Sequence, residues 1–79
     1  MELKQMQVAF DAGGLISAAI VRAPLMNGYI LIVKNKNGVE HVMTAQRDTA
    51  GHPRSFKTID AAVANAQKIG FMTVNVDLK

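Results

Sequence analysis

His41 and His52 are the only imidazoles in this sequence, so any nucleophile that needs a histidine base must lie near one of them. His52 has Asp48 and Ser55 close by, which are the residue types of a nucleophile–base–carboxylate triad. All three belong to a stretch without periodicity that is typical of an exposed loop, and no nucleophile elbow or glycine-rich oxyanion site accompanies them. A solvated loop is the preferred interpretation, and we expect no enzymatic activity.

Metal and cofactor sites lack support in the residue spacing. The two histidines stand eleven positions apart with only Asp48 as a further acidic or imidazole ligand between them, which matches no established ligand spacing. The six carboxylates are scattered, and the glycines sit at predicted turns or at a helix end rather than in a phosphate-cradling loop. We therefore expect no metal and no cofactor. The sequence does not reveal whether His41 or His52 has a role.

Positive charge is concentrated between residues 34 and 57. Five of the nine basic residues lie there, against only Glu40 and Asp48 as acids. Such residues, on a hairpin tip and a loop, could contact phosphates, or they could simply keep a small protein soluble. The aromatic residues are better placed in a core, so base stacking is not indicated. The candidate residues for binding nucleic acid or a partner are Lys34, Lys36, Arg47, Arg54 and Lys57.

The elements that must position these residues follow from apolar periodicity and turn signals. Alternation over residues 4–10 predicts a first strand with Val8 facing the core, and Gly13-Gly14 predicts a reversal. Further strands are predicted over residues 15–22, 29–33 and 39–46. The strand over residues 29–33 is the best candidate for a central strand. Asn37-Gly38 predicts the hairpin that joins the last two. Residues 47–55 are predicted to form an exposed loop.

The apolar period changes after Thr58. A stripe at helical spacing predicts a helix of about three turns, with Thr58 as N-cap and Gly70 at the left-handed C′ position. Strict alternation over residues 71–78 then predicts a final strand. The predicted order is β-β-β-β-α-β. We expect an α+β fold in which a single antiparallel sheet carries one helix packed on one face.

Length and composition restrict the class of protein further. The sequence has 79 residues, and we expect residues 1–79 to form one domain. Because it contains no cysteine, the fold must be stabilised by apolar packing. No apolar run is long enough to span a membrane, and the first residues do not look like a secretory signal, so a cytoplasmic location is expected. The net charge of +3 is compatible with a polyanionic partner without requiring one.

A second candidate surface is apolar. The runs 15–21 and 29–33 carry apolar side chains on both faces of their strands, whereas one helix can cover only one face of a sheet. Loops, a second copy or another protein must shield the opposite face. We expect a homodimer that forms through the sheet at micromolar concentration, although small residues such as Ala18 and Ala19 make this face shallow.

Gln46-Arg47 and the stretch from Arg54 to Ala62 resemble small plasmid partition-associated accessory proteins of ParC type. The resemblance extends to Phe10-Asp11, to Arg22-Ala23-Pro24 and to Ile69-Gly70-Phe71. The Phe-Lys-Thr sequence before an alanine-rich helix is also similar to the arm-type DNA-binding domains of phage integrases, from which the extra first and last strands depart. Either resemblance implies a protein of a bacterial mobile element that binds DNA or a DNA-handling partner, and neither implies a catalytic residue.

The leading hypothesis is a non-enzymatic accessory module of a plasmid or phage that acts through protein–protein contacts. One alternative is sequence-tolerant binding of nucleic acid by the basic segment 34–57. Another is a small inhibitor of a host enzyme.

Overall fold

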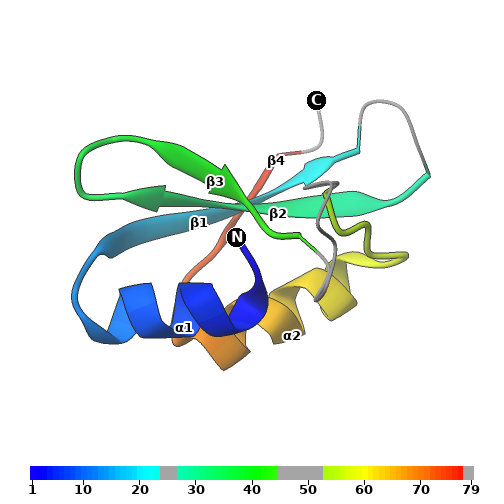
Figure 1. The fold of residues 1–79 in the computed structure, drawn as a ribbon. Coiled ribbons are helices and arrows are strands. Elements are labelled where there is room, and N and C mark those ends of the chain that lie inside the picture. The colour runs from blue at the N-terminus through cyan, green and yellow to red at the C-terminus, as the bar shows by residue number, and fades with distance from the viewer. Residues whose placement is uncertain (24–26, 45–52, 78–79) are drawn as a thin grey trace.

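The computed structural model describes residues 1–23, 27–44 and 53–77, which form two helices and one four-stranded sheet (Figure 1). The class is therefore α+β, as the sequence predicts. The elements in chain order are α1 (Leu3–Asp11), β1 (Leu15–Arg22), β2 (Tyr29–Asn35), β3 (Glu40–Val42), α2 (Ile59–Ile69) and β4 (Asn75–Asp77). The observed order, α-β-β-β-α-β, differs from the predicted one at the first element.

The prediction of a strand over residues 4–10 is wrong, because these residues belong to α1. A capping box starts the helix: the side chain of Glu2 accepts a hydrogen bond from the backbone of Gln5, and the Gln5 side chain accepts one from the Glu2 N–H at 2.8 Å. Met6 and Phe10 are four residues apart, so they lie on one side of the helix, where Met6 is fully buried. Val8, which alternation places in the core, is 64% exposed.

The sheet is mixed, with strand order β3-β2-β1-β4, so the prediction of an all-antiparallel sheet is also wrong. The β1–β2 and β2–β3 pairs are antiparallel, as their short connections predict. Strand β4 runs parallel to β1, because α2 carries the chain back along the sheet before β4 begins. Of the predicted strand 71–78, β4 forms Asn75–Asp77, and Leu78 lies outside the described residues. Phe71 packs in the core instead. Of the predicted strand 39–46, β3 forms residues 40–42, and residues 45 and 46 lie outside the described part of the chain.

Both helices lie on the same side of the sheet (Figure 1). The prediction of a single helix is therefore corrected to two, while the prediction that one face is left without a helix is confirmed. The side chain of Gln7 on α1 donates to the Lys68 carbonyl of α2 at 2.9 Å. The rings of Phe10 and Phe71 meet edge to face at 4.9 Å between centroids. The buried core contains Met6, Leu15, Ala18, Ile20, Leu31, Val33, Met43, Phe56, Ala62, Ala66, Ile69 and Phe71.

The predicted limits of α2 are confirmed at both ends. The Thr58 hydroxyl accepts a hydrogen bond from the Ala61 N–H at 3.1 Å, and Gly70 has a φ of +129°. Neither helix in the described ranges has the length and apolar character that crossing a bilayer would require.

Candidate binding surfaces

The face of the sheet opposite the helices, called here the helix-free face, is defined by the strand register. Paired residues on neighbouring strands share a face, and Ala18, Ile20, Leu31 and Val33 are buried with the helices. Their alternate neighbours therefore form the helix-free face. Its residues are Ser17, Ala19 and Val21 on β1, Ile30, Ile32 and Lys34 on β2, Glu40 and Val42 on β3, and Asn75 and Asp77 on β4.

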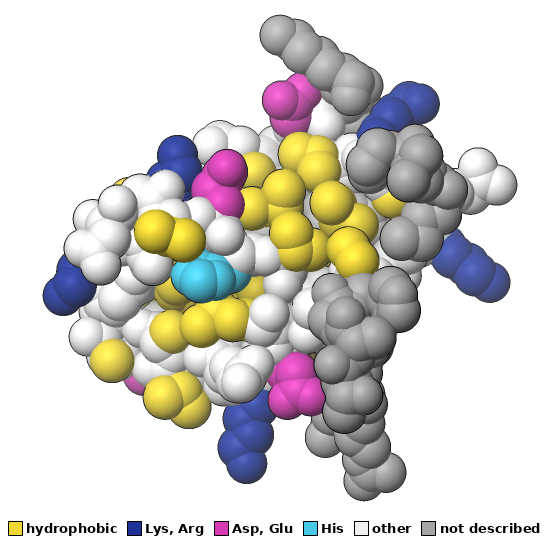
Figure 2. Space-filling model, turned by 45° about the horizontal axis from the view of Figure 1, so that its top comes forward, with side chains coloured by type: hydrophobic (Ala, Val, Ile, Leu, Met, Phe, Trp, Pro, Cys, Tyr) yellow, Lys and Arg dark blue, Asp and Glu magenta, His cyan; other side chains and the backbone are white. Residues whose placement is uncertain are grey.

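The apolar side chains of this face are contiguous. Ile32 lies between Ala19 on one side and Val42 on the other, and the Val21–Ile30 pair forms the adjoining row. Figure 2 shows hydrophobic side chains gathered over the middle of this side of the molecule. Ile30 is buried, whereas the other four are half-buried. The face thus has an apolar centre, with a polar row at one end made of Ser17, Lys34 and Glu40.

The structure distributes the predicted basic residues over opposite ends of the sheet. Lys34 lies on the helix-free face beside Glu40, and Lys36 lies in the turn that follows β2. Arg54 and Lys57 lie near the other end, where the backbone of Phe56 pairs with that of Tyr29. Since six residues separate the two ends of β2, these ends are roughly 20 Å apart along the strand. Arg54 lies between them, because its N–H donates to the Met43 carbonyl and the Met43 N–H donates to the Leu31 carbonyl. Arg47 lies outside the described residues.

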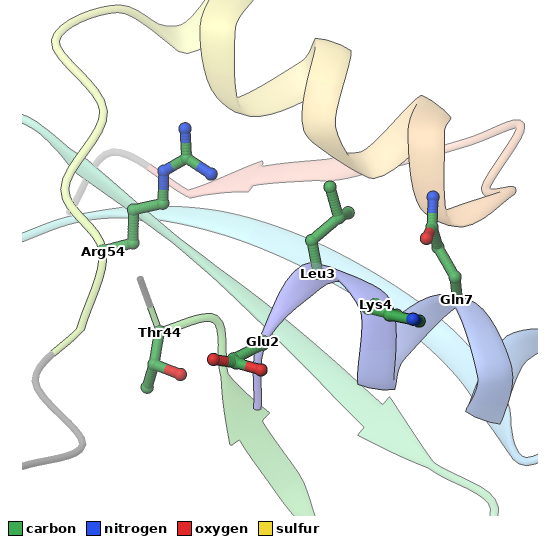
Figure 3. A pocket seen from close by; sticks show the side chains of 6 residues that line it. All are labelled: Glu2, Leu3, Lys4, Gln7, Thr44 and Arg54. Carbon is green, nitrogen blue, oxygen red and sulfur yellow. The ribbon is translucent and has the colours of Figure 1, made fainter. Parts of the chain in front are cut away.

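Arg54 contributes to a pocket of about 280 Å³ between the first turns of α1 and the end of β3 (Figure 3). Its lining residues are Glu2, Leu3, Lys4, Gln7, Thr44 and Arg54. The Arg54 guanidinium carbon lies 5.0 Å from the centre of the Phe56 ring, a cation–π distance that fixes the side chain against the core. Because the lining carries charges of both signs, it favours neither an anionic nor a cationic ligand.

A second pocket, of about 380 Å³, contains Lys57. We call it the Arg22–Lys57 pocket, and its lining residues are Arg22, Ala23, Asn27, Gly28, Tyr29 and Lys57. Arg22 is a binding candidate that the sequence analysis missed, because it lies outside the basic segment 34–57. Arg22 pairs with Tyr29 on β2, and this pairing places it in the same pocket as Lys57. No feature of the residues around Arg22 indicates that pairing.

Of the two histidines, His41 belongs to the described part of the chain. His41 Nε2 lies 3.4 Å from the side-chain nitrogen of Asn35, and His52 falls outside the described residues. Within residues 1–23, 27–44 and 53–77, no group of three His, Asp or Glu side chains is placed to hold a metal ion.

Searches with family models, with the sequences of curated proteins and with solved structures found no match to this chain. The resemblances to partition-associated proteins and to integrase arm domains therefore stay predictions, as does nucleic-acid binding by the basic segment.

Proposed function

We propose that this protein is a non-enzymatic binding module that acts through protein–protein contacts, and that the contact surface is the helix-free face. The observation that carries the proposal is the placement of both helices on one side of the sheet, which leaves the Ile32 row uncovered by either helix. An apolar centre with a polar margin is the usual anatomy of a protein interface. A role as an accessory protein of a mobile element rests on the sequence resemblance alone.

The partner that this face fits best is a second copy of the chain. Lys34 and Glu40 are neighbours across β2 and β3, and Ile32 and Val42 are neighbours in the next row. A two-fold axis parallel to these strands, between β2 and β3, would set Lys34 of each copy over Glu40 of the other and Ile32 over Val42. The face is therefore complementary to itself in both charge and apolar character. Its aliphatic side chains also suit the spacing of about 10 Å between packed sheets.

The size of the face predicts how strongly it associates. The four strands contain 8, 7, 3 and 3 residues in chain order. At about 3.3 Å per residue and about 4.8 Å per strand, they give a patch of roughly 330 Å² per copy. Two copies would bury at most about 660 Å², because the axis between β2 and β3 sets only these two strands over each other, and this area is below the ~1,200–2,000 Å² of stable complexes. We therefore expect a weak, rapidly exchanging dimer rather than an obligate one. Such a dimer leaves the same face available to other proteins with flat apolar surfaces.

Sedimentation velocity over a range of concentrations tests the proposal. The parent should shift from monomer toward dimer between ~5 µM and ~500 µM, the range expected of a micromolar dissociation constant. Ile32→Lys places a charge in the middle of the helix-free face and should keep the protein monomeric throughout. Val8→Lys is the matched control, because Val8 is exposed on α1 on the opposite side of the sheet. Circular dichroism should show that both variants remain folded.

If the parent protein stays monomeric at the highest concentration, the proposal of self-association is wrong. Equal loss of the dimer in the Val8→Lys and Ile32→Lys variants would assign the contact to another surface.

A further inference from the structure

The described lining of the Arg22–Lys57 pocket carries positive charge and includes no carboxylate. Two of its six described lining residues are cationic, and the others are Ala23, Asn27, Gly28 and Tyr29. Two carboxylates lie on neighbouring elements, Asp60 in the first turn of α2 and Asp77 beside Val21 on β4, and neither lines the pocket. The charge of the lining therefore favours an anion.

Strand pairing brings the two cations to opposite sides of Tyr29. On one side Arg22 pairs with Tyr29 across β1 and β2. On the other side Tyr29 and Phe56 exchange two backbone hydrogen bonds, of 2.8 and 2.7 Å, and Lys57 follows directly. Since neighbouring strands lie about 4.8 Å apart, the Arg22 and Lys57 backbones are separated by roughly 10 Å. Side chains of this length can both reach one small anion placed between them.

The floor of the pocket is held by close backbone contacts. Gly28 has a φ of +127°, and a Cβ atom there would lie 2.6 Å from both the Phe56 carbonyl oxygen and Ser55 Oγ. The Ser55 hydroxyl donates to the Asn27 carbonyl at 3.2 Å, and the Ala23 N–H donates to the Gly28 carbonyl at 3.0 Å. Gly28 therefore packs on the segment before α2 more closely than a residue with a Cβ atom could. This packing fixes the distance between the two cationic positions.

We propose that the Arg22–Lys57 pocket is a binding site for a phosphate monoester group. A phosphate monoester carries a charge of about −1.5 to −2 at neutral pH, which two cations balance. The planar guanidinium of Arg22 supplies paired donors for two phosphate oxygens, and the ammonium of Lys57 supplies a compact charge for a third. The site is separate from the helix-free face and does not depend on the proposed dimer.

Tyr29 provides the probe for this site, because it is the single tyrosine and the chain has no tryptophan. Its fluorescence therefore reports from the lining of the pocket itself. Titration with inorganic phosphate, with chloride used to hold the ionic strength constant, should give a saturable change. Arg22→Gln and Lys57→Gln should each weaken phosphate binding at least about tenfold, the effect expected when a charge-assisted hydrogen bond is lost.

The matched controls are Lys36→Gln, in the turn at the opposite end of β2, and Lys68→Gln, in the last turn of α2. Both remove one positive charge without touching the pocket, so phosphate binding should be unchanged. A fluorescence response that is absent or not saturable would overturn the proposal. Equal weakening by Lys36→Gln would also overturn it, because net charge alone would then explain the effect. Circular dichroism verifies the fold of each variant.

Two further titrations identify what carries the phosphate. Adenosine monophosphate and phosphoserine present the same group on a nucleoside and on an amino acid. Tighter binding of one than of inorganic phosphate identifies the carrier, and equal binding of all three supports recognition of the phosphate group alone.

Discussion

Gly70→Ala tests how the end of α2 is joined to α1. Gly70 has a φ of +129°, where an L-residue costs about 1–2 kcal/mol. A Cβ atom at this position would also lie 2.6 Å from Phe10 Cε1 and 2.7 Å from Phe10 Cδ1. Because ordinary contacts begin near 3.4 Å, the Phe10 ring would have to move by roughly 0.8 Å, the difference between 3.4 and 2.6 Å.

Moving that ring disturbs its edge-to-face contact with Phe71, which is worth about 0.5–1.5 kcal/mol. The backbone and ring contributions together predict that Gly70→Ala lowers the free energy of unfolding by about 1.5–3.5 kcal/mol. A chain of this length has a total stability of roughly 4–12 kcal/mol, so the variant should remain folded and measurable by urea denaturation.

Gly38→Ala is the control that separates the two contributions. Gly38 has a φ of +86°, and a Cβ atom there would meet nothing within 4 Å, so only the backbone cost of about 1–2 kcal/mol applies. In a Phe10→Ala background, Gly70→Ala should cost no more than Gly38→Ala, because the obstructing ring is gone. The reasoning fails if Gly70→Ala and Gly38→Ala are equally costly in the parent, or if Phe10→Ala leaves the cost of Gly70→Ala unchanged.

Two further predictions concern the helix cap and the basic segment. Thr58→Ala removes the hydrogen bond from the Ala61 N–H and should lower the free energy of unfolding by about 1 kcal/mol. The exposed control Thr73→Ala should change it by less than about 0.5 kcal/mol in the same urea titration, and equal effects would contradict the cap. If Arg47, Arg54 and Lys57 contact duplex DNA, replacing all three by alanine should flatten the dependence of log affinity on log salt by about 2.7 units. Gel-shift titration at two salt concentrations measures this, and a parent that does not bind at low salt eliminates direct recognition.

The parts of the fold that were predicted well are those specified by neighbouring residues. The limits of β1 follow from a run of strand-forming residues that ends before a proline. The limits of α2 follow from an apolar stripe at helical spacing that lies between Thr58 and Gly70. The pattern over residues 4–10 predicts a strand wrongly, because Met6, Val8 and Phe10 satisfy a period of two while Met6 and Phe10 also satisfy helical spacing. The capping residues Glu2 and Gln5 were the local signal that distinguishes these alternatives.

Strand topology and the second pocket depend on contacts between distant residues, which periodicity does not contain. Nothing near Asn75 indicates that β4 lies beside β1, because that position is set by where α2 packs. The approach of Arg22 to Lys57 likewise depends on two strand pairings that meet at Tyr29. The apolar surface was predicted more readily, since continuous apolar runs in β1 and β2 require side chains on both faces whatever the topology.

Isotope-filtered NMR on an equal mixture of ¹³C-labelled and unlabelled protein tests the proposed contact surface most directly. At a concentration where sedimentation shows dimer, intermolecular nuclear Overhauser effects should arise from the methyl groups of Ile32 and Val42 on the helix-free face. They should be absent from Val8, which lies on the opposite side of the sheet. Effects from Val8 without any from Ile32 or Val42 would contradict the proposal that the protein binds through the helix-free face.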